Sequence, residues 1–218
     1  MTIVVRTLSE RIFEVIRERI IEGQLSDMEP VRQDALAKEL GVSKIPLREA
    51  LARLEHEGLL TSQPNRGWFV QPMTTDQAEE IYELRLLIEP TAAARGARMA
   101  SEAERTAAIE AFERLDKAAE TDLPEVGVRN REFHVTLVRP GQRLLTTQQV
   151  ERLEVLAERY VIAHLEPAGR EDRAHGEHKD LLQAWLARDE EAVRKLLTHH
   201  IAATLEDLRA HFAVSQSG

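Results

Sequence analysis

Three histidines and one asparagine in the second half of the chain could do chemistry together. Asn130 and His134 lie four residues apart, so they are neighbours on one face of a helix, and that face is otherwise apolar. His178 lies at the centre of a second apolar stripe, and His200 lies within a third, while His199 falls on the opposite side of its helix. We therefore expect an amide and three imidazoles, from three helices, to face a common interior.

Two interpretations of these inward-facing side chains remain open from their spacing. Buried polar groups need partners, and these four could satisfy one another through hydrogen bonds as a structural cluster. Alternatively, imidazoles from three helices could bind a divalent metal ion. Because the chain has no cysteine, the ligands of any metal would have to be histidine, carboxylate or amide groups.

A second stretch, Gly41–Gly58, has the pattern of a nucleic-acid reader. We expect Ser43 to cap a helix that begins at Lys44, with a proline tolerated in the first turn. Leucines repeat at helical spacing along one side of this helix, while Lys44 and Arg48 can point outward. A shorter predicted helix, 34–40, precedes it. The pair is a helix-turn-helix candidate, and this motif reads DNA.

The elements around this motif predict a winged helix-turn-helix domain over residues 1–72. The run from Thr7 to Glu10 has the form of a capping box that opens a first helix. After Gly58, two short extended runs flank an Asn- and Gly-containing turn, which predicts a β-hairpin with Arg66 at its tip. Three helices followed by a hairpin make a winged helix.

Residues 76–213 predict a second, all-helical domain. Helical segments are expected at 76–99, 101–120, 125–138, 143–166, 171–187 and 189–212. Short connections between them favour an antiparallel bundle. The predicted fold class is therefore mainly α, with an N-terminal winged helix-turn-helix joined to an all-α antiparallel helical bundle.

Charge and composition narrow the possible partners. The net charge is −9, and most of it lies in the second domain: residues 1–72 carry 10 Lys and Arg against 11 Asp and Glu, the remainder 19 against 27. An acidic body repels phosphate, so DNA contact must come from a local basic patch on the first domain. No run approaches the roughly 20 apolar residues of a membrane span, and the lack of cysteine favours the cytoplasm.

These features together resemble the GntR family of bacterial transcription regulators, in the FadR-type branch with a C-terminal effector-binding FCD domain. The DNA-binding half of the resemblance rests on the blocks GVSKIPLREAL (41–51), LEHEGL (54–59) and PNRG (64–67). The other half rests on Asn130–His134, Glu177–His178 and His200–Ile201, which match the places of the family's metal ligands. The second domain is predicted to have six helices rather than seven, and in this it resembles the VanR-type subgroup.

The resemblance implies a homodimer that binds a two-fold symmetric operator and is not an enzyme. A small carboxylate metabolite in the bundle would change its DNA affinity. The residues implied to contact DNA lie at the start of the recognition helix and in the wing: Arg32, Ser43, Lys44, Ile45, Arg48, Arg66 and Gly67. Among them, Arg48 can make a bidentate contact with a guanine edge.

Three positions depart from the family pattern in the DNA-binding half. Lys44 stands where the family usually has Arg, and Ile45 where it usually has Thr. Lysine lacks the planar fork that suits guanine. Asp34 stands where a basic residue is common, and it would face phosphate unfavourably unless Arg32 takes over that contact. The class of operator therefore transfers to this chain, but its base sequence does not.

The resemblance also implies a divalent metal, Zn²⁺ or Ni²⁺, held by Asn130, His134, His178 and His200. Asn130 stands where the family commonly has Asp, so it offers a carbonyl oxygen without negative charge. We expect the metal to be retained but bound more weakly. In such domains an inward arginine can hold the effector carboxylate, which makes Arg85 a candidate, although its spacing from Glu89 predicts a surface ion pair.

Two other function classes compete with a transcription regulator. A metal ion with open positions could activate water, as in a hydrolase. However, Glu132 is expected to project away from His134, and Glu177 is merely adjacent to His178, so no general base is evident. A purely structural dimer module is the third interpretation, and it predicts no retention on DNA.

Overall fold

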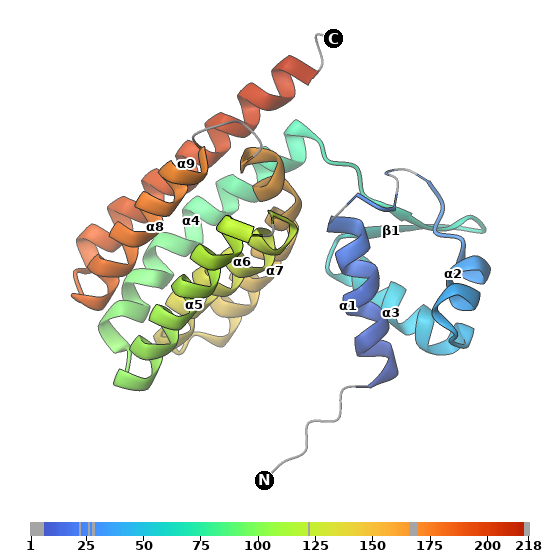
Figure 1. The fold of residues 1–218 in the computed structure, drawn as a ribbon, viewed down its shortest axis with the longest axis horizontal. Helices are drawn as coiled ribbons and strands as arrows, with labels where there is room; N and C mark the ends of the chain where they lie inside the picture. Colours follow the sequence, from blue (N-terminus) through green and yellow to red (C-terminus); the bar gives the residue numbers. More distant parts are fainter. Residues whose placement is uncertain are drawn as a thin grey trace. The chain divides into compact units, whose positions relative to one another are not determined.

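The computed structural model describes residues 7–21, 23–25, 27, 29–121, 123–165 and 170–215. The chain divides into two compact units, Met1–Met73 and Thr74–Gly218. Figure 1 shows the first unit in blue to cyan and the second in green to red. Among the described residues, no helix is long and apolar enough to cross a bilayer.

The N-terminal unit combines helices with a two-stranded hairpin, as predicted. Its elements are α1 (Leu8–Ile21), α2 (Gln33–Leu40), α3 (Lys44–His56), β1 (Leu60–Gln63) and β2 (Gly67–Val70). The capping box forms at the start of α1, where the Thr7 amide donates to Glu10 Oε2 at 2.7 Å and the Glu10 amide to Thr7 Oγ1 at 3.2 Å. Helix α1 packs on α3, whose leucines are fully buried.

The turn between α2 and α3 depends on Gly41, whose φ of 65° is left-handed. Glycine adopts this conformation without strain. Ser43 precedes α3 in the extended backbone conformation expected of a cap, but its hydroxyl makes no capping hydrogen bond within the described part of the chain. The predicted side-chain cap is therefore wrong, because the Ser43 hydroxyl is not within hydrogen-bonding reach of the first amides of α3.

The wing is held against α3 by one carboxylate. Strands β1 and β2 pair antiparallel from Leu60↔Val70 to Gln63↔Gly67. Glu55 of α3 accepts hydrogen bonds from the Ser62 amide at 3.1 Å and from Trp68 Nε1 at 2.8 Å. Both strands of the hairpin are thus tied to the same helix.

The C-terminal unit is a bundle of long helices, as predicted. Its described elements are α4 (Thr75–Met99), α5 (Glu102–Thr121), α6 (Leu123–Val138), the 3-10 helix η1 (Arg139–Gly141), α7 (Leu144–Leu165), α8 (Arg170–Leu186) and α9 (Glu190–Ser215). Each predicted helix end lies within three residues of the observed end. The predicted end at residue 166 lies outside the described residues.

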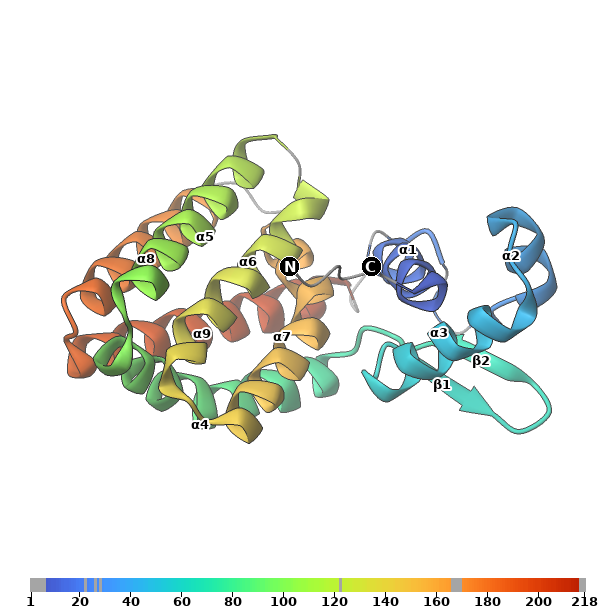
Figure 2. The ribbon, with the colours of Figure 1, turned by 90° about the horizontal axis from the view of Figure 1, so that it is seen from below.

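These helices close into a ring. In the order α4, α9, α8, α5, α6 and α7, each contacts the next, and α7 returns to α4 (Figure 2). Inside the ring, α4 and α6 approach so closely that a methyl group added at Gly96 would overlap the Leu137 carbonyl oxygen. Trp185 of α8 donates from Nε1 to the Ala93 oxygen at 3.1 Å and to the Leu137 oxygen at 3.0 Å. One indole thereby joins three helices.

Candidate functional site

Three imidazoles meet inside this ring, one each from α6, α8 and α9. His134 Nε2 lies 3.3 Å from His178 Nε2, and the ring centroids of His178 and His200 are 4.5 Å apart. One ring nitrogen from each histidine lies within 4.8 Å of the other two. All three side chains are buried, whereas His199 is 72% exposed, so its predicted outward orientation is confirmed.

A carboxylate orients one of these rings. Glu177 Oε2 lies 2.7 Å from His200 Nδ1, which leaves Nε2 as the other ring nitrogen available to a metal. Burial alone would raise the pKa of Glu177, but the hydrogen bond from His200 lowers it below its usual value. A carboxylate on the far nitrogen fixes the tautomer and orientation of a metal-binding histidine. The expectation that Glu177 is merely a neighbour of His178 is therefore wrong, because α8 turns its carboxylate toward α9.

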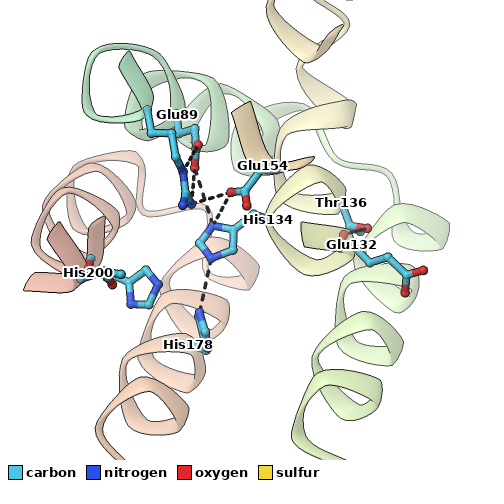
Figure 3. A network of polar contacts seen from close by, with 9 residues as sticks. Glu89, Glu132, His134, Thr136, Glu154, His178 and His200 are labelled. Atoms are coloured by element: carbon cyan, nitrogen blue, oxygen red, sulfur yellow. Dashed lines mark hydrogen bonds and ion pairs between the residues drawn. The ribbon is translucent and has the colours of Figure 1, made fainter. Parts of the chain in front are cut away.

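On the other side of His134 lies a buried charge cluster (Figure 3). Arg85 and Glu89 form the ion pair that their spacing predicts, at 2.6 Å, but the pair is buried, so the expectation of a surface pair is wrong. The reason is a second carboxylate from α7: Glu154 Oε1 lies 2.6 Å from Arg85 Nη2. Burial alone would lower the pKa of Arg85, but these two carboxylates raise it and keep the guanidinium charged.

The environment keeps His134 neutral. Its Nδ1 lies 3.8 Å from a Glu89 oxygen and 3.7 Å from a Glu154 oxygen, with no hydrogen-bond partner among the described residues. Burial, and then the nearby Arg85 cation, lower the pKa of His134. Neutral imidazole is the form that binds a metal. Glu89, His134 and Glu154 also lie close enough to share a cation, but the guanidinium already supplies that charge.

A pocket with a cavity volume of about 50 Å³ adjoins the histidines and is lined by all six helices. Its buried end includes Asn130, His178 and His200, and Arg85 also lines it. Asn130 is 5% exposed and lies one turn before His134 on α6. The structure therefore brings Arg85, Asn130, His178 and His200 to the lining of one cavity, while His134, which contacts His178, is not part of that lining.

On the N-terminal unit, the departures at Lys44 and Asp34 contact each other. Lys44 Nζ lies 2.6 Å from Asp34 Oδ1, and both side chains are largely exposed. An aspartate at the start of α2 thus partly neutralises the first basic residue of the recognition helix. Ile45, next in sequence, is 72% exposed. An exposed aliphatic side chain here suits contact with a thymine methyl group.

The remaining predicted DNA contacts lie on the same unit. Arg48 is exposed, and its Nε donates to Gln33 Oε1 at 3.1 Å. Arg66 lies over the Phe69 ring and donates to Gln63 Oε1 at 2.8 Å. Arg32, just before α2, and Ser43, just before α3, are also exposed. Gly67 is half-buried and lies beside Gln33.

Sequence reasoning missed three polar residues that these sites use: Gln33, Glu154 and Glu177. Gln33 is the first residue of α2, one position before the predicted start. Glu154 lies on the buried face of α7, at helical spacing from Val150 and Ala157, so the periodicity that exposed the histidines could have found it. Glu177 had no such signal, because its neighbour His178 takes the inward position on α8.

Comparison with known proteins agrees with both units. Residues 8–70 match the family "Bacterial regulatory proteins, gntR family", and residues 80–203 match the FCD domain. The chain is 23% identical to the HTH-type transcriptional repressor RspR of Escherichia coli K12, over 93% of this chain and 89% of that one. It is 27% identical to the Nta operon transcriptional regulator of Aminobacter aminovorans, over 79% and 81%.

Solved structures support the same fold. E. coli McbR/YncC superposes with a TM-score of 0.81 at 22% identity, covering 95% of this chain and 100% of that one. Both sequence relatives are transcription regulators, which decides against the metal-dependent hydrolase. On these matches, the chain belongs to the GntR family of bacterial transcription regulators, as a member with a C-terminal FCD domain.

Proposed function

We propose that this regulator is a homodimer that binds a two-fold symmetric operator, and that a small carboxylate metabolite bound beside a His-coordinated metal changes its DNA affinity. The observation that carries this proposal is the cluster of three buried imidazoles, two of which, His178 and His200, also line a cavity of the bundle. A ligand shifts DNA affinity only if it binds the DNA-competent and DNA-incompetent states differently. A cavity that touches every helix of the bundle suits such a difference.

The residues present fit a divalent metal. His134, His178 and His200 offer nitrogen ligands, and Zn²⁺ and Ni²⁺ both accept imidazole. His200 also has the supporting carboxylate that metal-binding histidines usually have. When bound, the metal would supply open coordination positions for an effector carboxylate. Asn130 would be the fourth protein ligand, through its carbonyl oxygen.

Replacing the usual aspartate by Asn130 removes one negative charge from this ligand set, so we expect weaker metal binding than in an aspartate-containing site. Metal content and affinity of the wild type and Asn130→Asp, measured by mass spectrometry and chelator competition, test this. Tighter binding in the variant is expected. Absence of bound metal in both proteins would refute the metal site while leaving operator binding to be judged separately.

The proposed operator face comprises the exposed residues Arg32, Ser43, Lys44, Ile45, Arg48 and Arg66, together with the half-buried Gly67. Arg48 supplies the strongest base-reading group, and the wing supplies Arg66 and the Gly67 backbone. Because the overall charge is −9, binding should be confined to this patch and should weaken steeply with salt.

Genome-wide selection of fragments with the purified protein tests operator binding. We expect recovery of palindromic sites, and the genes beside them would identify candidate metabolites. Arg48→Ala should abolish enrichment, while Lys38→Ala, an exposed cation at the end of α2, serves as control. A purely structural dimer module would retain no DNA, and that outcome would refute the proposal.

A further inference from the structure

Tyr82 of α4 is a polar group in the pocket that the proposed function does not use. Its side chain is fully buried and lines the cavity, and its hydroxyl has no hydrogen-bond partner among the described residues. Leaving a buried hydroxyl without a partner costs folding free energy. A buried hydroxyl without a partner, on a residue of the cavity lining, points to a bound acceptor.

The phenol can act only as a neutral hydrogen-bond donor or acceptor here. Burial raises the pKa of Tyr82, so the hydroxyl keeps its proton at physiological pH. Arg85 lies 4.9 Å from the centre of the Tyr82 ring, and both Glu89 and Glu154 hold that guanidinium in place. A ligand acceptor at this end of the cavity would meet the donor hydroxyl of Tyr82, beside a guanidinium that two carboxylates already pair.

The body of the cavity offers little to a polar ligand. Between the buried histidines and the mouth, its walls are formed by apolar side chains of four helices: Leu115, Ala119, Val126, Val161 and Ile201. Hydroxyl groups of a ligand placed there would lose their water without gaining partners. An apolar ligand body would instead gain the free energy of leaving water.

The half-exposed mouth of the cavity carries a carboxylate. Asp116 of α5 and His175 of α8 both line the cavity and pair at 2.6 Å, with side chains 42% and 43% exposed. Phe112 packs against the same histidine, with ring centroids 5.7 Å apart. A second carboxylate at the outer end of a ligand would approach Asp116, and like charges at short range repel.

We propose that the cavity takes a monocarboxylic acid with an apolar body, whose carboxylate accepts a hydrogen bond from the Tyr82 hydroxyl. The apolar walls hold the body, and Asp116 selects against a second negative charge at the mouth. This inference rests on the proposed effector function and specifies the chemical class of the effector.

Three six-carbon acids separate the features of this ligand: hexanoate has one carboxylate and an apolar body, adipate adds a second carboxylate, and gluconate adds hydroxyl groups. Titration calorimetry of the full-length protein should give an affinity for hexanoate at least about tenfold above that for either other acid. Asp116→Asn should narrow the gap between hexanoate and adipate.

The two tyrosines of the chain provide a matched pair of variants. Tyr82→Phe should lower hexanoate affinity about tenfold, the loss of one hydrogen bond to a charged group, while leaving the melting temperature of the free protein unchanged or higher. Tyr160 is also buried, but its hydroxyl bonds to Thr74 and Gln77 outside the cavity lining. Tyr160→Phe should lower stability and leave hexanoate affinity unchanged.

Several outcomes overturn the inference. If gluconate or adipate binds as tightly as hexanoate, the assigned ligand class is wrong, although the proposed effector function stands. Equal hexanoate affinity in Tyr82→Phe and the wild type removes the role of the hydroxyl. If none of the three acids binds, both the inference and the carboxylate effector are refuted, while operator selection still tests DNA binding independently.

Discussion

The pairing of Glu177 with His200 makes a quantitative prediction about metal affinity. Glu177→Gln keeps the size of the side chain and an oxygen that can accept the His200 Nδ1–H, but it removes the negative charge 2.7 Å from that nitrogen. The imidazole then becomes less basic, and its tautomer is held less firmly. We expect weaker metal binding with an unchanged fold.

The structure also sets the size of this effect. Loss of a carboxylate behind a metal-binding histidine costs about 10- to 100-fold in affinity, or ~1.4–2.8 kcal/mol. Glu177 also contacts Arg173, with Arg173 Nε 3.5 Å from Glu177 Oε1, so part of its charge is already compensated. Gln also preserves one hydrogen bond. We therefore expect the lower end of the range, about tenfold.

Competition with a zinc-binding dye, followed for wild type and variant at neutral pH, measures the change. Glu132→Gln is the matched control, because Glu132 is ion-paired on α6 and lies away from the histidines (Figure 3). Its affinity should stay within twofold of the wild type. Equal zinc affinity in Glu177→Gln and Glu132→Gln would show that the carboxylate does not support His200 as a ligand.

Other predictions concern packing, DNA binding and pH. Gly96→Ala should lower the unfolding free energy by about 1–3 kcal/mol in urea titration, since its methyl group overlaps a carbonyl of α6. Asp34→Asn should release Lys44, tighten operator binding and steepen its salt dependence in fluorescence anisotropy; unchanged binding would contradict this. Hydrogen bonds from the wing lower the pKa of Glu55, so the stability they give is present above pH 4.5 and falls below it. The change of Trp68 fluorescence with pH should report that loss of stability. The same change should be smaller in Glu55→Gln.

Periodicity was sufficient to predict the architecture of both units. Helix positions in the bundle, the capping box at Thr7 and the wing depend on local patterns of apolar spacing, caps and turn residues, which a sequence displays directly. The inward direction of His134 and His200 follows from the same helical period. These features need no knowledge of which helices become neighbours.

The contacts that failed to be predicted all join separate elements. Arg85 is buried because Glu154, 69 residues away, meets it from the neighbouring helix α7, and spacing within α4 alone suggested an exposed pair. The Lys44–Asp34 pair depends on the angle between α2 and α3. Ser43 shows the complementary case: the sequence predicts where the helix starts, but not whether the Ser43 hydroxyl caps it.

Within the ring of helices, the cavity lining and the histidine cluster come partly from different helices. Helix α5 contributes Phe112, Leu115, Asp116 and Ala119 to the cavity but none of the clustered histidines. Substitutions along this one helix can therefore change which molecule fits without disturbing the imidazoles on α6, α8 and α9. Under the proposed effector function, two copies of such a chain could come to bind different effectors through changes in α5 while keeping the same DNA-binding unit.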